Sequence, residues 1–280
     1  IAMSIGDRPG LVVGFVGGAI AKAGTTFTSF SNPDEVLVSS GFLGALLAGF
    51  IGGYVILLLK KIFSFMPKSL EGIRTILIYP VAGVLLIGII MLLINPFVSA
   101  INTGLNNFLF SLSGVNKIIL GAILAGMMSV DLGGPVNKAA YTFGTGMLAE
   151  GHYEIMAAVM IGGMIAPLAI ALVATFFPKK LPKKERQAGL LNYVMGLSFI
   201  SEGAIPFASA DPLRVLPSCV VGSAVSGAMS MAFNCTLMAP HGGIFVLPLI
   251  GNWGWYLVSL VVGSVVSMAI MTALKKNVWE

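Results

Sequence analysis

Apolar segments long enough to cross a lipid bilayer recur along the whole of this sequence, and they restrict the chain to a membrane-spanning fold. Four of them read as complete spans, at residues 39–59, 76–98, 155–177 and 255–274. A helix needs about 20 apolar residues to cross a hydrocarbon core of about 30 Å, and a removable signal peptide would explain only one such segment. Only 10% of the residues are charged, against about 25% in soluble domains. We therefore predict an all-α, polytopic membrane protein.

The basic residues predict which ends of these spans face the cytoplasm. Most of the net charge of +5 comes from residues just outside apolar segments, at 60–68, 179–186 and 275–276. Lys and Arg accumulate in cytoplasmic loops, so we expect the stretch 99–153 to begin and end on the outer side. His152 is then expected to be a solvated residue of an outer loop. The positive charge is a topology signal and predicts no nucleic-acid partner.

Three breaks that contain glycine and proline interrupt the apolar sequence, at residues 131–138, 201–212 and 239–243, and each carries ionisable or amide side chains. The apolar arms around the first break, 118–130 and 139–148, would each be only about 20 Å long as helices and cannot span alone. Such re-entrant segments are tolerated where they are buried in protein or line a watery cavity. Paired interruptions of this kind indicate a transporter binding site.

The domain organisation is predicted from residues 102–113, which alternate apolar and amide side chains. This pattern is typical of a short amphipathic helix at the membrane surface. We expect an amphipathic connector over residues 99–115, between membrane subdomains at residues 1–98 and 116–280. The sequence begins with Ile1 rather than Met, so further helices are expected upstream.

Small residues recur on one face of the first span, where Ala45, Gly49 and Gly53 fall four residues apart. This spacing lets helices approach closely. The pattern marks either a subunit interface or helix packing inside one chain.

Glu202 is the strongest candidate site residue, because it stands among apolar residues beside Gly203 and Pro206. A charge at the centre of a span costs at least about 2.5 kcal/mol, so an ionisable group at that depth predicts a functional site. The glycine and the proline would open the backbone for a ligand. A carboxylate can accept hydrogen bonds from two vicinal hydroxyls of a sugar. The alternative is a helix cap or a structural ion pair with a buried Arg.

His241 and Asn137 are the next candidates for ligand contact. His241 follows a proline and precedes Gly242 and a second glycine, so irregular backbone is expected to present its ring. An imidazole can donate to one hydroxyl and accept from another, and together with Glu202 it could manage a proton during phosphoryl transfer. Asn137 offers a paired donor and acceptor, which suits a polyol. The alternative for His241 is a core histidine with internal partners.

Four further charged residues allow either a structural or a functional reading. Asp211 and Arg214 lie three residues apart, so they can pair on one helical face, with Asp211 as a cap. Asp131 and Lys138 can neutralise each other across their turn. A Lys at depth could instead attract a phosphate. All four are included in the predicted substrate site.

Motifs of several enzyme classes are absent from the sequence. It holds no Walker-type phosphate loop, no His-Glu-x-x-His zinc motif and no Gly-x-Ser-x-Gly elbow, which argues against ATP-driven transport or hydrolysis by this chain. Nothing in the sequence around Asp131 and Asp211 favours an aspartyl dyad. Cys219 and Cys235 lie in apolar sequence and are expected to behave as small hydrophobic residues. We expect no metal and no cofactor.

The three breaks resemble the membrane-embedded IIC component of fructose-type sugar phosphotransferase systems. The resemblance rests on residues 131–141, on residues 202–207 followed by 211–214, and on residues 239–243, which read DLGGPVNKAAY, EGAIPF, DPLR and APHGG. Residues 6–10, GDRPG, are similar too. Ser201 stands where the family pattern leads us to expect Thr, and the family's leading helices are not in this sequence.

The resemblance implies a function and a set of partners. Such a protein carries a hexose, typically fructose, across the bacterial cytoplasmic (inner) membrane while a partner IIB domain phosphorylates it. IIB bears a phosphocysteine and is charged through IIA, HPr and enzyme I. Neither cysteine here lies in a IIB-like context, so the phosphocysteine has to come from another domain.

The resemblance also implies an assembly and roles for two side chains. We expect a homodimer embedded in membrane lipid, with residues 1–98 as scaffold and dimerisation subdomain and residues 116–280 as transport subdomain. Glu202 and His241 are expected to bind sugar hydroxyls near the phosphoryl acceptor and to serve as catalytic residues.

Two other function classes stay open from the residues alone. One is a secondary transporter driven by H⁺ or Na⁺, with Glu202 or Asp131 as its ion site. The other is a structural or receptor module that binds no solute.

Overall fold

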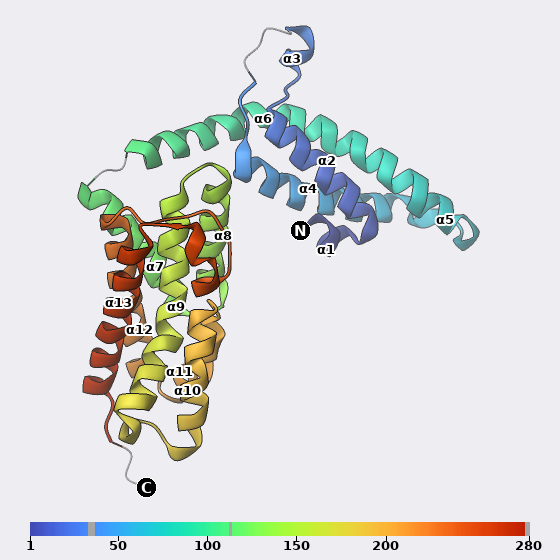
Figure 1. Cartoon of the computed structure of the whole chain (residues 1–280). Helices are drawn as coiled ribbons and strands as arrows, with labels where there is room; N and C mark the ends of the chain where they lie inside the picture. Colours follow the sequence, from blue (N-terminus) through green and yellow to red (C-terminus); the bar gives the residue numbers. More distant parts are fainter. Residues whose placement is uncertain (33–36, 112–113, 278–280) are drawn as a thin grey trace. The chain divides into compact units, whose positions relative to one another are not determined.

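The computed structural model describes residues 1–32, 37–111 and 114–277, and it consists almost entirely of helices (Figure 1). The chain divides into two compact units, unit 1 at Ile1–Ser111 and unit 2 at Leu112–Glu280. Within the described residues, five helical segments are long and apolar enough to cross a membrane: Gly41–Phe65, Glu71–Gly104, Tyr153–Phe176, Pro212–Ala232 and Trp253–Leu274. They include all four predicted spans, and the predicted all-α polytopic fold is confirmed.

Unit 1 is built on three long helices, α2, α4 and α6, which contact one another. Its elements are α1 (Ala2–Gly6), α2 (Arg8–Ala23), α3 (Thr28–Ser31), α4 (Gly41–Ile62), the 3-10 turns η1 (Phe63–Phe65) and η2 (Lys68–Leu70), α5 (Glu71–Ile73), the π-helical turn η3 (Arg74–Ile78) and α6 (Tyr79–Ser111). Aliphatic side chains from the three long helices form one hydrophobic core, in which Val13, Ile56 and Ile87 are fully buried.

Helix α6 differs from the expected arrangement around residue 99. It continues without interruption for 33 residues to Ser111, so most of the predicted connector at residues 99–115 belongs to the same helix. The described boundary between the compact units falls after Ser111. Gly104 has open space around it and Asn102 is buried. The amide residues of this stretch therefore belong to α6, which continues through them, and no new helix begins there.

The small-residue pattern of α4 is used inside the chain. A β-carbon added to Gly53 would lie 2.7 Å from Cβ of Ile5, and one added to Gly49 would lie 3.2 Å from Cβ of Ile1. Both glycines thus admit the short α1 helix to the surface of α4. Packing within the chain accounts for two of the three positions, while Ala45 is exposed.

Unit 2 is a bundle around one central helix, α9. Its elements are α7 (Gly114–Val130), α8 (Pro135–Ala149), α9 (Tyr153–Phe176), the 3-10 turn η4 (Pro178–Lys180), α10 (Lys183–Leu197), the 3-10 turn η5 (Ser201–Ala204), α11 (Ile205–Ala210), α12 (Pro212–Ala232), β1 (Thr236–Leu237), the 3-10 segment η6 (Gly243–Leu249), β2 (Ile250–Gly251) and α13 (Trp253–Leu274). In Figure 1, α9 runs down the middle of the unit, and α7, α8, α10, α12 and α13 all contact it.

Helix α12 packs through small residues spaced four apart, which bring helix backbones close together. A β-carbon on Gly222 would lie 2.6 Å from the carbonyl oxygen of Gly263 in α13, and one on Gly227 would lie 2.3 Å from that of Gly121 in α7. The buried serines of α12, such as Ser223, fit the same tight crossings. Because serines and prolines lower its apolar content, α12 does not stand out in the sequence as a complete span.

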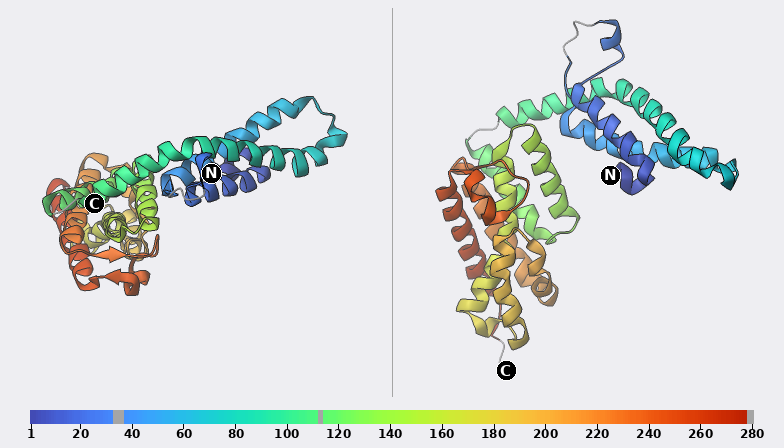
Figure 2. Two further views of the ribbon diagram at one scale, coloured as in Figure 1. Left: turned by 90° about the horizontal axis from the view of Figure 1, so that it is seen from above. Right: turned by 45° about the vertical axis from the view of Figure 1, so that its right-hand side comes forward.

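Helices α7 and α8 form an antiparallel hairpin with a tight turn, as Figures 1 and 2 show. They have 17 and 15 residues and are about 26 and 23 Å long, so neither crosses a core of about 30 Å alone. Only residues 131–134 leave the helical conformation, because Pro135 starts α8 at once. The third break is shaped differently: β1 and β2 form a short antiparallel ribbon that encloses the 3-10 segment η6.

Candidate functional site

The three predicted breaks meet at one cavity in unit 2. Its volume is about 200 Å³, the space of roughly six or seven water molecules. The lining residues come from the end of α7, the first turns of α8, η5 with the two residues before it, and the segment after β1: Met128, Asn137, Lys138, Tyr141, Phe199, Ile200, Ser201, Glu202 and His241. Four predicted site residues, Asn137, Lys138, Glu202 and His241, are therefore brought together.

The turn between α7 and α8 is held by Asp131. Its carboxylate accepts hydrogen bonds from the backbone N–H groups of Val136 (2.7 Å) and Asn137 (2.9 Å) at the start of α8. Those amides have no partner inside the helix, so a carboxylate there satisfies them. Asp131 does not line the cavity and does not pair with Lys138 in the structure. The predicted neutralisation across the turn is replaced by this cap.

Hydrogen bonds to neighbouring residues hold the side chain of Asn137 in the cavity wall. Its amide nitrogen donates to the carbonyl oxygen of Met128 at 2.6 Å and to Oγ of Ser201 at 3.4 Å. The second bond joins the α7–α8 turn to the segment that carries Glu202. Within the described residues the carbonyl oxygen Oδ1 has no hydrogen-bond partner, so it remains available as an acceptor.

The 3-10 turn η5 presents Glu202 toward the α7–α8 turn. A β-carbon on Gly133 would lie 2.8 Å from Oε1 of Glu202, so only a glycine lets the two breaks approach this closely. Gly133 also has φ of 105°, which disfavours any other residue. Phe199 has φ of 62°, a strained value for a bulky residue. Strain of this type is often found at functional sites.

Aromatic rings hold His241 at the cavity wall. The imidazole centroid lies 5.0 Å from that of Phe199 and 6.5 Å from that of Tyr141, with the latter pair edge to face. Gly242 and Gly243 both have positive φ, and a β-carbon on Gly243 would lie 2.1 Å from the carbonyl oxygen of Leu197. The glycines therefore let this loop press against the end of α10, as their position after His241 predicted.

The ionisable side chains of the cavity form no hydrogen bond or ion pair with other described residues. Glu202, Lys138 and His241 are exposed, and across residues 1–32, 37–111 and 114–277 no side-chain hydrogen bond or ion pair involves any of them. Glu202 and Lys138 thus carry opposite charges beside the same space without neutralising each other. A ligand that enters can engage both groups without first breaking an internal bond.

Asp211 and Arg214 lie away from this cavity. Arg214 donates from Nη1 to Oδ1 of Asp211 at 3.2 Å, and Lys275 after α13 donates to Oδ2 at 3.1 Å. Burial alone would raise the pKa of Asp211, but the hydrogen bonds and charges of Lys275 and Arg214 outweigh burial and hold this pKa below its ordinary value. The structural reading of the pair is the one that its geometry favours. Asp211 makes no side-chain cap bond to α12.

Three other predicted residues support the site from outside the cavity. A β-carbon on Gly203 would lie 2.2 Å from Oδ1 of Asn192, so this glycine lets η5 pack onto α10. Pro206 is in the first turn of α11, and Gly242 shapes the backbone after His241. The expectation for His152 is wrong: its side chain is 2% exposed, because it lies between α8 and the start of α9.

The rings of Tyr141 and Phe199 were not predicted as site residues. Both line the cavity, and their centroids are 6.1 Å apart. Their position in the sequence could have indicated them as site residues, since each lies within a few residues of a predicted break. Phe199 also packs its ring onto α9, where a β-carbon on Gly163 would lie 2.4 Å from Cε2.

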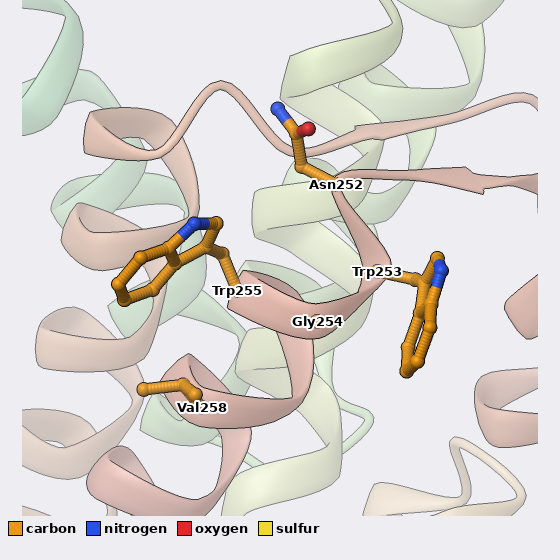
Figure 3. A pocket seen from close by; sticks show the side chains of 5 residues that line it. All are labelled: Asn252, Trp253, Gly254, Trp255 and Val258. Atoms are coloured by element: carbon orange, nitrogen blue, oxygen red, sulfur yellow. The ribbon is translucent and has the colours of Figure 1, made fainter.

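A second hollow of unit 2, of about 660 Å³, has a different character. It surrounds the first turn of α13, where Trp253 and Trp255 point to opposite sides (Figure 3). Both indoles are exposed, and Trp255 stacks on Phe233 with centroids 4.2 Å apart. Exposed Trp at the end of a span is typical of the aromatic belt at a membrane surface. No charged residue lines this hollow.

Comparison with known proteins assigns the chain to a family. The model of the family "Phosphotransferase system, EIIC" matches residues 1–222. The chain belongs to this EIIC family. It is 48% identical over its whole length to the PTS system fructose-specific EIIABC component of Bacillus subtilis (strain 168), of which it covers 42%. It is also 48% identical over its whole length to the Fructose permease IIC component of Bacillus amyloliquefaciens, of which it covers 88%.

A third relative matches almost the whole chain. The PTS system fructose-specific EIIC component of Haloferax volcanii is 40% identical over 99% of this chain, which covers 75% of that protein. No solved structure matches the chain. The predicted family is confirmed, and the chain is a multi-pass protein of the cytoplasmic membrane. Membership in this family does not favour the ion-coupled alternative.

Proposed function

We propose that this EIIC chain carries a hexose across the cytoplasmic membrane while a phosphorylated IIB domain transfers a phosphoryl group to it. The proposal depends on one observation: three backbone breaks bring an unpaired carboxylate, an ammonium, an imidazole and a fixed amide to one cavity of about 200 Å³. A sugar is dense in hydroxyls that both donate and accept, and this set offers donors and acceptors around a small space.

Glu202 is proposed to hold the sugar through adjacent hydroxyls. Its carboxylate is only an acceptor when ionised and has no protein partner to displace within the described residues. Asn137 would add an acceptor from the base of the cavity through its unused Oδ1. Tyr141 and Phe199 supply apolar faces for the C–H surface of a sugar ring. Polar groups around an apolar wall are typical of small-molecule sites.

His241 and Lys138 are proposed to serve the phosphoryl transfer. The imidazole can accept the proton of the attacking hydroxyl, and the neighbouring rings of Tyr141 and Phe199 limit its orientation. The ammonium of Lys138 can stabilise the charge on the incoming phosphoryl group. Since such transfers need mainly positioning and charge stabilisation, the chain requires no nucleophile of its own.

Fructose is the first sugar to test, because the printed names of the relatives specify it. The name of the Bacillus subtilis relative joins A, B and C components in one protein, which supports a IIB partner that is either fused or separate. We further propose that the chain acts as a homodimer in a lipid membrane, with residues 1–98 as its scaffold and residues 116–280 as its transport part.

The first experiment compares two acids of the same region. Glu202→Gln is expected to weaken hexose binding by at least about tenfold, because it removes a charge-assisted acceptor, in titration calorimetry of purified protein. Asp211→Asn is the matched control, since Asp211 pairs with Arg214 and Lys275 outside the cavity. Full binding and phosphorylation by Glu202→Gln would refute the role of this carboxylate.

The second experiment tests the coupling in sealed vesicles. With phosphorylated IIB outside, the expected product is sugar phosphate, and its yield should be independent of ion gradients. Glu202→Gln and His241→Ala should reduce this yield. Delivery of free sugar that collapses with the proton or sodium gradient would overturn group translocation.

A further inference from the structure

Unit 1 holds a charged cavity that the transport site does not use. Its volume is about 680 Å³, and it lies between the start of α2, the end of α4 and the segment from α5 to α6. The lining residues are Asp7, Arg8, Pro9, Lys60, Ser64, Glu71, Arg74, Thr75 and Tyr79. Three of them belong to the GDRPG motif at residues 6–10, whose role the sugar site leaves unexplained.

The backbone at this motif is strained. Asp7 has φ of 60° and ψ of −159°, a combination that essentially only glycine adopts, and it separates α1 from α2. Its carboxylate forms an ion pair with Lys60 at the end of α4. This pair fixes the strained turn and thereby points the next residue, Arg8, to the cavity.

The cations of the cavity are only partly neutralised. Glu71 lies 3.9 Å from Nη2 of Arg74, a distance too long for a strong bond. The guanidinium of Arg74 donates from Nη1 to the carbonyl oxygen of Phe63 at 3.1 Å, while its buried Nε has no hydrogen-bond partner. Arg8 has no ion-pair partner among the residues that the structure describes. Three cations and two carboxylates leave the cavity with a formal charge of +1.

Exposed apolar side chains stand close in the sequence to each of the cationic residues. Leu11, three residues after Arg8, is 59% exposed; Phe65, five after Lys60, is 78% exposed; and Ile76, two after Arg74, is 80% exposed. This is the basic end of α4 and α6, which the positive-inside rule assigns to the cytoplasmic surface. Exposed apolar residues therefore accompany the charged hollow at the end of unit 1 that is expected at the level of the lipid headgroups.

We propose that this cavity binds the headgroup of an anionic phospholipid of the inner leaflet. Arg8 and the guanidinium of Arg74 donate to the phosphate oxygens, Lys60 stays with Asp7, and the acyl chains lie along the exposed apolar side chains. Basic pockets at the cytoplasmic ends of spans suit such headgroups. An apolar border would give no advantage to a free phosphate ion, which favours the lipid as the source of the phosphate.

The test measures lipids retained by the purified full chain, by native mass spectrometry after exchange into mixed micelles of phosphatidylglycerol and phosphatidylcholine. Arg8→Gln combined with Arg74→Gln should weaken retention of phosphatidylglycerol by about tenfold. Lys61→Gln is the matched control, because Lys61 is exposed beside Lys60 but does not line the cavity. Arg8→Gln alone, at an exposed position, should give a smaller loss in a protein of unchanged helicity by circular dichroism.

Several outcomes would overturn the proposal. Equal retention of the two lipids would show that the cavity does not select an anionic headgroup. An equal loss of lipid in Lys61→Gln would show that retention depends on the overall surface charge and not on this cavity. Competition by inorganic phosphate at millimolar concentration would assign the cavity to a free phosphate. If the double variant kept its lipid but lost phosphorylation by IIB, the cavity would be a protein docking surface.

Discussion

Helix α9 of unit 2 and helix α6 of unit 1 are both strongly apolar, yet their surroundings are opposite. The structure buries 94% of the most apolar window of α9 and only 22% of the corresponding window of Glu71–Gly104. Both helices read as spans in the sequence. The difference lies in their partners: five helices contact α9, whereas α6 contacts mainly α2 and α4. Apolar content therefore predicts a span but not whether lipid or protein surrounds it.

The two helices also differ in how they are held. α9 and its neighbours approach through small residues, so that Gly162 admits the backbone of Ala125 in α7. α6 carries larger side chains and is anchored by the polar side chain of Asn95, which is 1% exposed. This contrast predicts that unit 2 is sensitive to any added volume and that unit 1 is sensitive to the loss of a few hydrogen bonds.

The largest effect is expected from Gly227→Ala. The added methyl group would lie 2.3 Å from both Cβ of Ala125 and the carbonyl oxygen of Gly121. Helix backbone cannot move aside cheaply, so overpacking should destabilise unit 2 by about 3 kcal/mol. The midpoint of thermal unfolding in detergent measures this loss.

Gly88→Ala is the matched control for Gly227→Ala in α6. Its methyl group would meet only Cδ1 of Ile20, at 4.0 Å, and the higher helix propensity of Ala should stabilise by up to about 1 kcal/mol. If both variants lowered the midpoint equally, unit 2 would be no more sensitive to added volume than unit 1, against our prediction.

The next effect is expected from Asn95→Ala. Its amide nitrogen donates to the carbonyl oxygens of Ile20 (3.1 Å) and Thr25 (2.9 Å), and its oxygen accepts from Oγ of Ser40 at 2.5 Å. Their loss leaves buried groups unpaired and should destabilise unit 1 by about 2 kcal/mol. Thermal unfolding again measures the change.

Asn102→Ala is the control that distinguishes the loss of hydrogen bonds in Asn95→Ala from the loss of side-chain volume. Asn102 is also a buried amide of α6, but its Oδ1 has no hydrogen-bond partner. We expect a clearly smaller destabilisation from this variant. Equal losses would mean that α6 is held by packing, as α9 is.

Much of the fold and of the candidate site could be predicted from the sequence, because the spans and breaks are local patterns. Apolar runs located α4, α6, α9 and α13, and the Gly and Pro clusters located the turns that bring Asn137, Lys138, Glu202 and His241 together. The length of the first break was less predictable. The sequence predicted eight non-helical residues, 131–138, but only four separate α7 from α8, because Pro135 begins the second helix.

Tertiary partners explain what the sequence could not predict. Asp131 and Asp211 looked like site residues because they are acids in apolar sequence, yet one caps α8 and the other pairs with Lys275, 64 residues away. The burial of His152 and the contact of the Phe199 ring with His241 likewise depend on residues far apart in the sequence, which no local pattern predicts.

A smaller effect is expected where the packing of α9 reaches the site. In Gly163→Ala the methyl group would lie 2.4 Å from Cε2 of Phe199, so the ring has to shift, which disturbs its contact with His241. We expect hexose affinity to fall by about tenfold, roughly 1.4 kcal/mol, in titration calorimetry. Gly126→Ala is the control, because its nearest new contact is an ordinary 3.7 Å. Unchanged affinity in Gly163→Ala would uncouple the core of unit 2 from the cavity.

The smallest effect is expected from the ion cluster of Asp211, and it should depend on pH. The folded protein holds the pKa of Asp211 below its ordinary value, against the effect of burial, through Lys275 and Arg214. A lowered folded pKa contributes stability that is fully present above the unfolded pKa of about 3.9 and is lost as the pH falls through the folded pKa. Because Arg214 is partly exposed, the contribution should be about 1 kcal/mol or less.

Lys275→Gln should therefore lower the unfolding midpoint slightly at pH 7, and the difference from the wild type should shrink below about pH 4. Lys276→Gln is the matched control, since it removes the same charge from an exposed neighbour outside the cluster. A difference that stayed constant into acid would show that the cluster acts through packing rather than charge. Unit 2 would then be held throughout by close fit, and the contrast with the polar anchor of unit 1 would become sharper.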